Sequence, residues 1–434
     1  MGMLIEPKIL KGFRDFLPAA ETERRRVRAV LEKTFEGFGF APIDTPVLEY
    51  TEVLLGKGGG ETDKQLYRFR DNGDRDVAMR FDLTVPFARF MAAHFHDLYL
   101  PFKRYHIAKV FRGENSQKGR YREFTQCDFD SVGTDCAGAD FEILLLMRQS
   151  FVNLGIQNLR IHLSHRGVFN RALRRLGAEN LCVDILRAVD KIKKTGEGEV
   201  RACLGALCGD AAAQTILDFI RAEETNARTL AKITRLAGGE DEDTRRLALI
   251  LGWMRAMDIE ASFFLDPSIT RGLDYYTGIV YETFLTDLPG IGSVCSGGRY
   301  NDLASLYTKE KLPGVGSSIG LDRLLAALEE LGQTAAGRRS PTQVLVFCTS
   351  ENDFARYHEA ARILREAGLN AEVYPEARKQ ANQFAFAEKK GIPLGLFVKP
   401  GAGENSLSLR DLRSRETVEA LSPLQAAAEI KRRL

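Results

Sequence analysis

Two β-like runs separated by a polar loop do most to restrict the fold of this 434-residue chain. The runs are YHIAKVFR at 105–112 and YREFTQCDFDSV at 121–132, and the loop between them, GENSQKG, is bounded by glycines. A loop of this kind suits a hairpin. Together with VAMRF at 77–81, these runs predict an antiparallel sheet.

Helical patterns surround these strands. Residues 21–39 place apolar side chains at helical spacing with ERRR on the other side, which predicts an amphipathic helix ending at Gly39. From about 170 to 257 the sequence is rich in Ala, Leu and Arg with little β pattern, so we predict a helical insertion. Strand patterns return at 278–286 and 293–298.

The chain is long enough for two to four domains, and its pattern changes near residue 332. A glycine-rich turn, PGVGSSIG, is predicted to lead into a helix at 321–331, and this closes a first domain at 1–331. The small, polar, proline-terminated segment 332–341 is predicted to be a linker. Beyond it, 342–434 alternates strand with helix and predicts a separate small α/β domain.

Composition excludes several classes of protein. No apolar run is long enough to span a bilayer and charges interrupt the start of the chain, so we expect a cytoplasmic protein. The net charge of +2 gives no global argument for a polyanionic partner, so any nucleic-acid binding must be local. The seven cysteines form no C-x-x-C pair and HFH at 94–96 lacks partners, so we expect reduced thiols and no metal held by protein ligands.

The second run of the hairpin carries a candidate site. Alternate residues of a strand share a face. The side chains predicted to share this face are Arg122, Phe124, Gln126, Asp128 and Asp130, and those on the opposite face are Cys127 and Phe129. Taken alone, the pattern is most simply a solvated face of an antiparallel sheet. The loop before it crowds Lys118 and Arg120 next to Arg112 and Glu114, and such a cluster suits a polyphosphate and its metal ions.

Two further segments concentrate hydrogen-bonding groups at strand ends. Asp82 and Thr84 directly follow a strand, where they either cap a helix or bind an ammonium group. The segment TRGLDYYTGIVYE at 270–282 places an arginine, an aspartate and two tyrosines before another strand, where tyrosines usually pack with their hydroxyls in water. Five glycines are expected to form sharp turns that let the backbone approach a ligand: Gly297, Gly298, Gly314, Gly316 and Gly320. Neither a Walker A nor a Rossmann fingerprint explains them.

Together these segments resemble one family, histidyl-tRNA synthetase, a class II aminoacyl-tRNA synthetase. FRGENSQKGRYREFTQCDFD at 111–130 is similar to its motif 2, GVGSSIGLDRL at 314–324 to its motif 3, and RGLDYY at 271–276 to its histidine-binding signature. KGFRDFLP at 11–18 and CSGGRYNDL at 295–303 also match family blocks. The resemblance spans essentially the whole chain. It implies an α+β catalytic domain with an antiparallel sheet flanked by helices, the helical insertion, and a C-terminal α/β anticodon-binding domain.

The resemblance also implies an activity. A histidyl-tRNA synthetase activates L-histidine with ATP and Mg²⁺ to histidyl-adenylate and pyrophosphate, then transfers histidine to the 3′ end of tRNA(His). It is a homodimer joined partly near residues 37–46. No editing domain is expected, because a pocket that pairs both imidazole nitrogens rejects apolar side chains.

Roles for individual residues follow from the resemblance. For ATP, Arg112 would hold the α-phosphate, Phe124 would stack on adenine and Arg323 would meet the γ-phosphate. Glu114 would contribute to the ATP or Mg²⁺ environment, and Arg271 would act with Arg112 as a catalytic cation. The residues implied to bind histidine are Asp82, Thr84 and Gln126 for the ammonium group, and Asp130, Tyr276 and the adjacent Tyr275 for the imidazole. Asp130 is one methylene shorter than the glutamate of many bacterial members.

Two other functions compete with this one. A regulatory paralogue from histidine biosynthesis keeps the catalytic fold without charging tRNA, but such paralogues usually lack the C-terminal domain and erode the histidine signature. Here 342–434 and RGLDYY are both present. A non-catalytic tRNA-sensing module would be expected to lose Arg112, Arg271 or Arg323, and the chain keeps all three.

Overall fold

The computed structural model describes residues 4–56, 65–115, 119–269, 276–334, 340–399 and 407–434. The chain divides into two compact units, the larger built mainly from residues 27–334 and the smaller mainly from residues 335–434. Of the helices in the described ranges, none is both long and apolar enough to cross a membrane.

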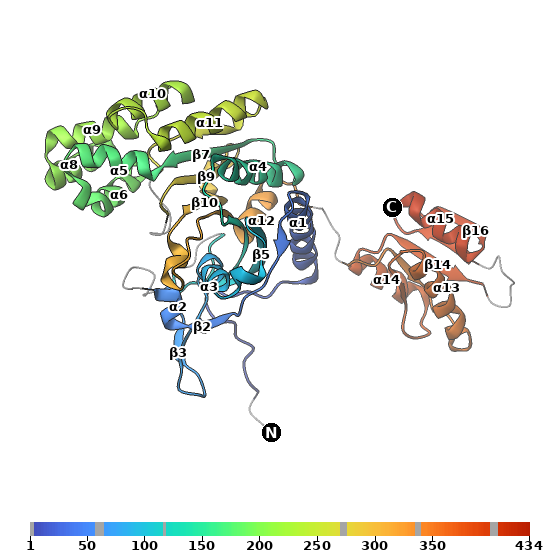
Figure 1. Ribbon diagram of the computed structural model, residues 1–434. Helices are drawn as coiled ribbons and strands as arrows, with labels where there is room; N and C mark the ends of the chain where they lie inside the picture. The colour runs from blue at the N-terminus through green and yellow to red at the C-terminus, as the bar shows by residue number, and fades with distance from the viewer. Residues whose placement is uncertain (1–3, 57–64, 116–118, 270–275, 335–339, 400–406) are drawn as a thin grey trace. The chain divides into compact units, whose positions relative to one another are not determined.

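An eight-stranded sheet organises the described part of the larger unit, in the order β1-β5-β6-β11-β10-β9-β7-β8 (Figure 1). The strands are β1 (Ala41–Pro42), β5 (Phe102–Phe111), β6 (Glu123–Val132), β11 (Gly314–Gly320), β10 (Cys295–Tyr300), β9 (Ile279–Leu285), β7 (Leu159–His165) and β8 (Phe263–Leu265). Neighbours from β5 through to β7 pair antiparallel, whereas the outermost pairs at both edges are parallel. The predicted hairpin is confirmed as β5 and β6.

Helices cover one face of this sheet with apolar side chains. They are α1 (Pro18–Gly37), α4 (Ala137–Asn153) and α12 (Leu321–Glu330). Phe35 of α1, Met147 of α4 and Leu324 of α12 join one buried cluster with Cys127 and Phe129 of β6. The two β6 residues predicted to point away from the polar face therefore lie in the main core.

Shorter elements adjoin the other end of the unit. The strands β2 (Leu48–Tyr50), β4 (Asp76–Met79) and β3 (Arg68–Arg70) form a small antiparallel sheet, and α2 is Thr51–Leu55. Helix α3 (Thr84–His94) begins five residues after β4 and buries Phe87 and Met91 against Phe102 and Val132.

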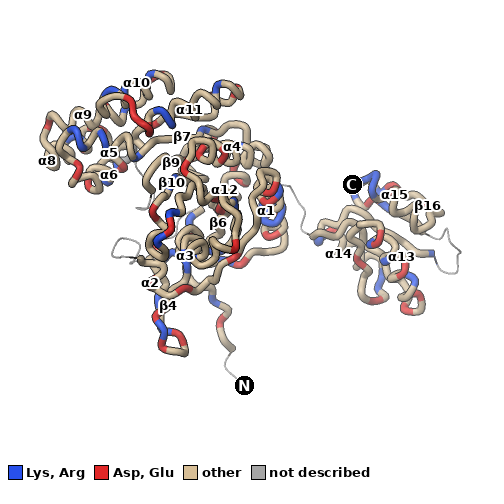
Figure 2. The backbone as a smooth tube through the Cα atoms, in the orientation of Figure 1, with Lys and Arg blue, Asp and Glu red and all other residues tan. Residues whose placement is uncertain are grey.

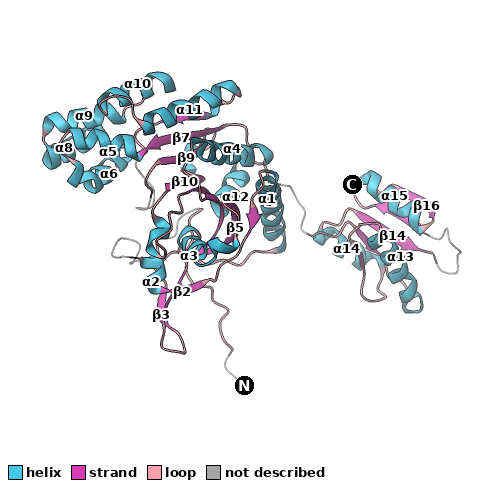
Figure 3. Ribbon diagram, in the orientation of Figure 1, coloured by secondary structure: helices cyan, strands magenta, loops and turns pink. Residues whose placement is uncertain are grey.

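The segment between β7 and β8 is helical, as its composition predicted (Figure 3). Its helices are α5 (Arg166–Arg175), α6 (Cys182–Asp190), α7 (Ile192–Thr195), α8 (Glu197–Cys208), α9 (Asp210–Ile220), α10 (Asn226–Leu236) and α11 (Glu242–Ala256). Helix α11 packs against α4 and α5, and its contact with α4 fixes the insertion to the helices that cover the large sheet.

The glycine-rich segment at 313–320 corrects one prediction. It is not a turn but strand β11, and the five glycines named above lie within β10 and β11 without positive φ angles. A Cβ on Gly316 would lie 1.9 Å from Asp130 Oδ1, and a Cβ on Gly314 would lie 2.4 Å from the ring of Tyr300. These strands use glycine because neighbouring side chains cross directly over their backbone.

The smaller unit has its own sheet, in the order β13-β12-β14-β15-β16. Its elements are β12 (Val344–Val346), α13 (Phe354–Glu366), β13 (Ala371–Val373), α14 (Gln380–Lys390), β14 (Leu394–Val398), β15 (Leu407–Asp411), β16 (Thr417–Leu421) and α15 (Pro423–Arg433). The first three strands in chain order are parallel and the last two pair antiparallel. The predicted α/β pattern is confirmed, with β16 and α15 as additions.

Candidate active site

Two adjoining cavities, of about 400 Å³ and 220 Å³, lie on the polar face of the large sheet. Both are lined by Arg112, Gln126, Glu282, Ser296 and Ser318. On β6, Asp128 and Asp130 are only 1% and 2% exposed. This face is therefore not a solvated surface, which corrects the simpler explanation of its polar residues.

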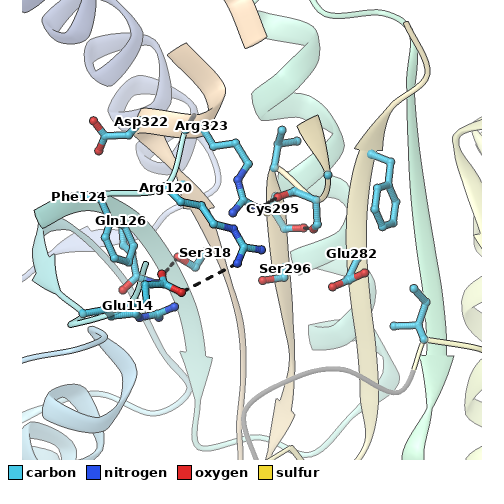
Figure 4. A pocket seen from close by; sticks show the side chains of 18 of the residues that line it. Glu114, Arg120, Phe124, Gln126, Glu282, Cys295, Ser296, Ser318, Asp322 and Arg323 are labelled. Carbon is cyan, nitrogen blue, oxygen red and sulfur yellow. Dashed lines mark hydrogen bonds and ion pairs between the residues drawn. The ribbon is translucent and has the colours of Figure 1, made fainter. Parts of the chain in front are cut away.

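The larger cavity gathers positive charge from distant parts of the chain. Arg112 follows β5 and lines this cavity. Arg120 precedes β6, and Arg323 lies in the first turn of α12 (Figure 4). Burial, followed by the positive charge of Arg120, lowers the pKa of Arg323, and Arg112 adds to this effect. Cations held this close are stabilised by an anionic ligand, so the cavity suits a polyphosphate.

Neighbouring groups hold these arginines in place. Arg112 Nε donates to the carbonyl oxygen of Phe81 at 3.0 Å, and its guanidinium carbon lies 5.1 Å from the centroid of the Phe124 ring. Arg323 donates to the carbonyl oxygen of Ser293. Arg120 and Glu114 form a loose ion pair of 4.0 Å (Figure 4). Glu114 and Phe124 both line the cavity, so the four residues predicted to bind ATP lie together.

Asp322, in the first turn of α12, connects this helix to strand β6. One of its carboxylate oxygens accepts a hydrogen bond from the Thr125 backbone amide at 2.8 Å, and the other pairs with Arg14. The guanidinium of Arg14 lies over the ring of Tyr121. Contacts between KGFRDFLP, β6 and α12 therefore fix where Arg323 enters the cavity.

The smaller cavity brings together five of the residues predicted to bind histidine. Asp82 and Thr84 come from the start of α3, Gln126 and Asp130 from β6, and Tyr276 from the segment before β9. Asp82 Oδ1 accepts a hydrogen bond from the Val85 amide at 3.1 Å. The two alternatives for Asp82 are thus compatible, because it caps the helix while lining the cavity.

Asp130 is held by two residues that the sequence did not reveal as site residues. Arg104 Nη2 lies 2.7 Å from Asp130 Oδ2, and the Tyr300 hydroxyl donates to Asp130 Oδ1 at 2.5 Å. Burial raises the pKa of Asp130, and Arg104 opposes that rise. Residues 104 and 130 lie opposite each other in the β5–β6 ladder, so the hairpin register is the signal that identifies Arg104.

Asp128 is a further buried acid beside this cavity that was not predicted to bind histidine. Thr84 Oγ1 lies 3.5 Å from its Oδ2. Burial raises the pKa of Asp128 to about 7, the positive charge of Arg104 opposes that rise, and the carboxylates of Asp130 and Asp82 add to it. The protonation state of this carboxyl therefore changes near neutral pH.

Two predicted site residues, Arg271 and Tyr275, lie outside the described residues, as does Lys118. The flanking backbone is described. Arg166 Nη1 donates to the carbonyl oxygen of Tyr276 at 3.0 Å, and the Thr277 amide donates to the carbonyl oxygen of Arg299 at 2.8 Å. The position of Tyr276 at the smaller cavity is thus fixed by both α5 and β10.

An antiparallel sheet flanked by helices, with these cavities on its polar face, is the fold of a class II aminoacyl-tRNA synthetase catalytic domain. The histidyl-tRNA synthetase family model matches residues 12–324, and an anticodon binding domain model matches residues 343–433. The chain belongs to the histidyl-tRNA synthetase family.

Individual relatives agree with this assignment. A protein named histidine–tRNA ligase from Treponema denticola is 54% identical over 92% of this chain and 90% of its own. The crystal structure of histidyl-tRNA synthetase from Nostoc sp. PCC 7120 superposes with a TM-score of 0.88 at 32% identity, covering 99% of this chain and 100% of that chain. A Bacillus halodurans structure, titled an ATP phosphoribosyltransferase regulatory subunit/histidyl-tRNA synthetase, shares the fold at 20% identity, with a TM-score of 0.74 over 89% of this chain and 97% of that chain.

The raised pKa of Asp128 predicts a pH-dependent stability. Between about pH 4 and about pH 7 the folded state keeps a proton that the unfolded state has released, so this group makes stability fall as pH rises through that window. Asp128→Asn has no such proton. We expect its melting temperature to gain several degrees on that of the wild type between about pH 4.5 and about pH 7.5.

Thermal unfolding followed by circular dichroism measures the difference. Asp302→Asn, at an exposed carboxylate, is the matched control and should keep a constant offset from the wild type. A constant offset for Asp128→Asn as well would show that Asp128 ionises like an exposed carboxylate.

Proposed function

We propose that this protein is a histidine–tRNA ligase, which activates L-histidine with ATP and transfers it to the 3′ end of tRNA(His). One observation carries the proposal. A cavity lined by Arg112, Arg120 and Arg323 adjoins a second cavity that presents Asp82 and Asp130. Cations for a polyphosphate thus lie beside carboxylates for an ammonium and an imidazole.

ATP occupies the larger cavity in this proposal. Arg112 holds the α-phosphate, Phe124 stacks on the adenine, and Arg323 meets the γ-phosphate. The placement of Phe124 beside Arg112 supports this order, because the base and the α-phosphate are close neighbours in a folded nucleotide. Glu114, which lines the same cavity, contributes to the ATP environment.

Histidine occupies the smaller cavity. Asp82, Thr84 and Gln126 receive its ammonium group, while Asp130 and Tyr276 bind the imidazole with Tyr275 beside them. The burial of Asp82 and Asp130 supports these roles, because a buried carboxylate gains most from a partner that brings charge or a hydrogen-bond donor. An apolar side chain would offer these carboxylates neither charge nor a hydrogen-bond donor, which supports discrimination by about 10⁴–10⁵.

The first chemical step joins the two ligands. The carboxylate oxygen of histidine attacks the α-phosphorus of ATP, the bond to the β-phosphate oxygen breaks, and pyrophosphate leaves with the bonding electron pair. Arg112 and Arg271 stabilise the negative charge that builds around phosphorus, and fixed cations do so without reorganising. Arg112 lines both cavities, as this role requires.

In the second step the terminal ribose hydroxyl of the tRNA attacks the carbonyl carbon of the adenylate, and AMP leaves. Neither step requires a nucleophile from the protein.

Mg²⁺ enters with ATP in this proposal. No group of three or more potential His, Cys, Asp or Glu ligands lies together among the described residues. Mg²⁺ commonly binds through substrate phosphates, waters and one or two carboxylates, so Glu114, one of the acids that line the cavity, fits such a site. When bound, the ion neutralises phosphate charge.

In this proposal the tRNA contacts two domains, the catalytic domain at 1–331 and the anticodon-binding domain at 342–434. Residues 332–341 form the linker between them. The anticodon binding domain model at 343–433 supports the last assignment. Helix α15 ends in Lys431, Arg432 and Arg433, which form a basic end to the helix (Figure 2). Glu429 pairs with both Arg432 and Arg433, so a phosphate that contacts this end would compete with that carboxylate.

We further propose that the enzyme is a homodimer that works in the cytoplasm. Leu48 and Tyr50 of β2, close in sequence to the predicted interface near residues 37–46, and Phe69 of β3 are 44–50% exposed. Exposed apolar groups on a short sheet suit a protein partner. Sedimentation equilibrium would measure whether the protein in solution has the mass of a dimer. All seven cysteines are unpaired, which suits a reducing compartment.

A regulatory subunit of histidine biosynthesis is the alternative function. The Bacillus halodurans structure shows that its fold would be similar, but fold alone does not separate the two. The ATP-binding and histidine-binding residues of this chain favour charging.

The proposal predicts histidine-dependent exchange of pyrophosphate into ATP by the purified protein. The other nineteen amino acids should support exchange at rates lower by about 10⁴. Radiolabelled pyrophosphate measures the reaction, and exchange no higher than background from folded protein would reject the ligase function.

Arg271→Ala tests the proposed catalytic role of Arg271 in the same assay. Because Arg271 is proposed to act mainly in the transition state, kcat should fall by about 10³ or more while the KM for histidine changes little. A variant that changes only KM would contradict a catalytic role for Arg271.

Removal of residues 342–434 separates the two steps. The truncated chain should keep histidine-dependent pyrophosphate exchange, because the described residues that line both cavities lie before residue 324. Charging of tRNA should weaken by about 10²-fold or more through loss of anticodon contacts. Equal kcat/KM for tRNA in the two proteins would remove the anticodon-binding assignment.

A further inference from the structure

A buried network of charges connects the helical insertion to the histidine pocket. Its central residue is Asp140 of α4, which is fully buried. Asp140 Oδ1 lies 2.7 Å from Nη2 of Arg299 in β10, and Asp140 Oδ2 lies 2.8 Å from Nε of Arg246 in α11. One carboxylate thus joins the catalytic sheet to the last helix of the insertion.

Asp135 closes the network on its outer side. Its Oδ1 lies 2.6 Å from Nη2 of Arg246 and 3.3 Å from Nη1 of Arg299. The Arg299 side chain is 1% exposed and that of Arg246 is 11% exposed. Removing one partner from such a network leaves a buried charge without compensation, so its geometry is tightly specified.

Arg299 is placed to transmit this geometry to the pocket. Its carbonyl oxygen accepts from the Thr277 amide, and its side chain passes so close to Gly278 that a Cβ there would lie 3.2 Å from it. Gly298, the residue before Arg299 in β10, leaves room for the ring of Tyr276. A Cβ at position 298 would lie 2.9 Å from that ring. A shift of Arg299 therefore displaces the backbone that carries Tyr276.

The residue after Arg299 acts on the opposite wall of the same pocket. Tyr300 donates its hydroxyl hydrogen bond to Asp130. Consecutive residues of one strand thus support the two groups proposed to bind the imidazole, Tyr276 and Asp130. The ATP cavity is lined by none of Arg246, Asp140, Arg299 or Tyr300.

We propose that Arg246, on insertion helix α11, is a positioning residue for the histidine pocket, acting through Asp140 and Arg299 on Tyr276 and on the Tyr300–Asp130 pair. The inference rests on the proposed ligase function and extends it to the insertion. It gives α11 an indirect influence on amino-acid binding. Any ligand that moves α11 then alters the affinity for histidine.

Arg246→Gln tests the proposal in the pyrophosphate exchange assay with full-length protein. We expect the KM for histidine to rise on the order of tenfold, with the KM for ATP and kcat changed by less than about twofold. A smaller fraction of folded protein would instead lower the apparent kcat without changing either KM, and a general distortion of the site would raise the KM for both substrates. Arg246→Lys keeps the charge but cannot pair with Asp140 and Asp135 together. Its KM for histidine should therefore lie between those of the wild type and Arg246→Gln.

Arg245→Gln is the matched control. Arg245 is the preceding residue of the same helix, is exposed, and donates from Nε to the Asp241 carbonyl oxygen at 3.2 Å. Its variant should keep the wild-type KM for histidine. Asp135→Asn serves as a second probe, since it weakens both arginine contacts but leaves Asp140 paired, and it should raise the histidine KM by about threefold.

The outcomes separate the two hypotheses. If the wild type shows no histidine-dependent exchange, the ligase function fails and this inference fails with it. If the wild type is active but Arg246→Gln and Asp135→Asn both keep the wild-type histidine KM, the positioning role alone is overturned. Equal rises in the KM for histidine and for ATP would also overturn it. If Arg246→Gln does not fold, the result for Asp135→Asn decides.

Discussion

The ion pair between Arg104 and Asp130 is the interaction on which the amino-acid pocket depends. Arg104 is fully buried, and its guanidinium contacts three residues from two elements of the pocket, β6 and the start of α3. Besides Asp130 on β6, Arg104 Nη2 donates to the carbonyl oxygen of Leu83 at 3.3 Å, and its guanidinium carbon lies 4.2 Å from the ring centroid of Phe87. Because Leu83 and Phe87 belong to the start of α3, this one side chain sets the distance between Asp82 and Asp130. It also opposes the burial that raises the pKa of Asp128 and of Asp130.

Around this pair the site separates its charges. The larger cavity gathers cations from three segments, and the smaller one presents the buried acids Asp82 and Asp130. The two share a boundary formed by Arg112, Gln126, Glu282, Ser296 and Ser318. A negatively charged nucleotide and a positively charged ammonium are each drawn to a different side of that boundary. In the proposed mechanism, the reacting carboxylate and the α-phosphorus would meet where the two cavities join. Strands hold most of the polar groups, and a rigid sheet preserves such an arrangement better than loops would.

The sequence predicted local structure better than it predicted long-range contacts. The hairpin of β5 and β6, the helical insertion and the alternating pattern of the C-terminal domain follow from periodicity, which depends on near neighbours. Strand β11 was wrongly predicted as a turn because glycine usually marks turns. Its glycines instead make room for side chains of the neighbouring strands, Asp130 on β6 and Tyr300 on β10.

The site residues show the same difference between local patterns, which the sequence predicted, and long-range contacts, which it did not. Asp82, Thr84, Gln126, Asp130 and Tyr276 come together as expected, whereas Arg104 and Tyr300 were missed because their role depends on strand register and on a contact spanning 170 residues. The binding and catalytic roles of all these residues stay predictions, and Arg271 and Tyr275 also lie outside the described residues. The direct test of the account is a crystal structure with L-histidine and a non-hydrolysable ATP analogue. It should place an imidazole nitrogen about 3 Å from an Asp130 oxygen, with Asp130 still paired to Arg104 and Tyr300. An imidazole bound elsewhere, or an Asp130 released from both partners, would contradict it.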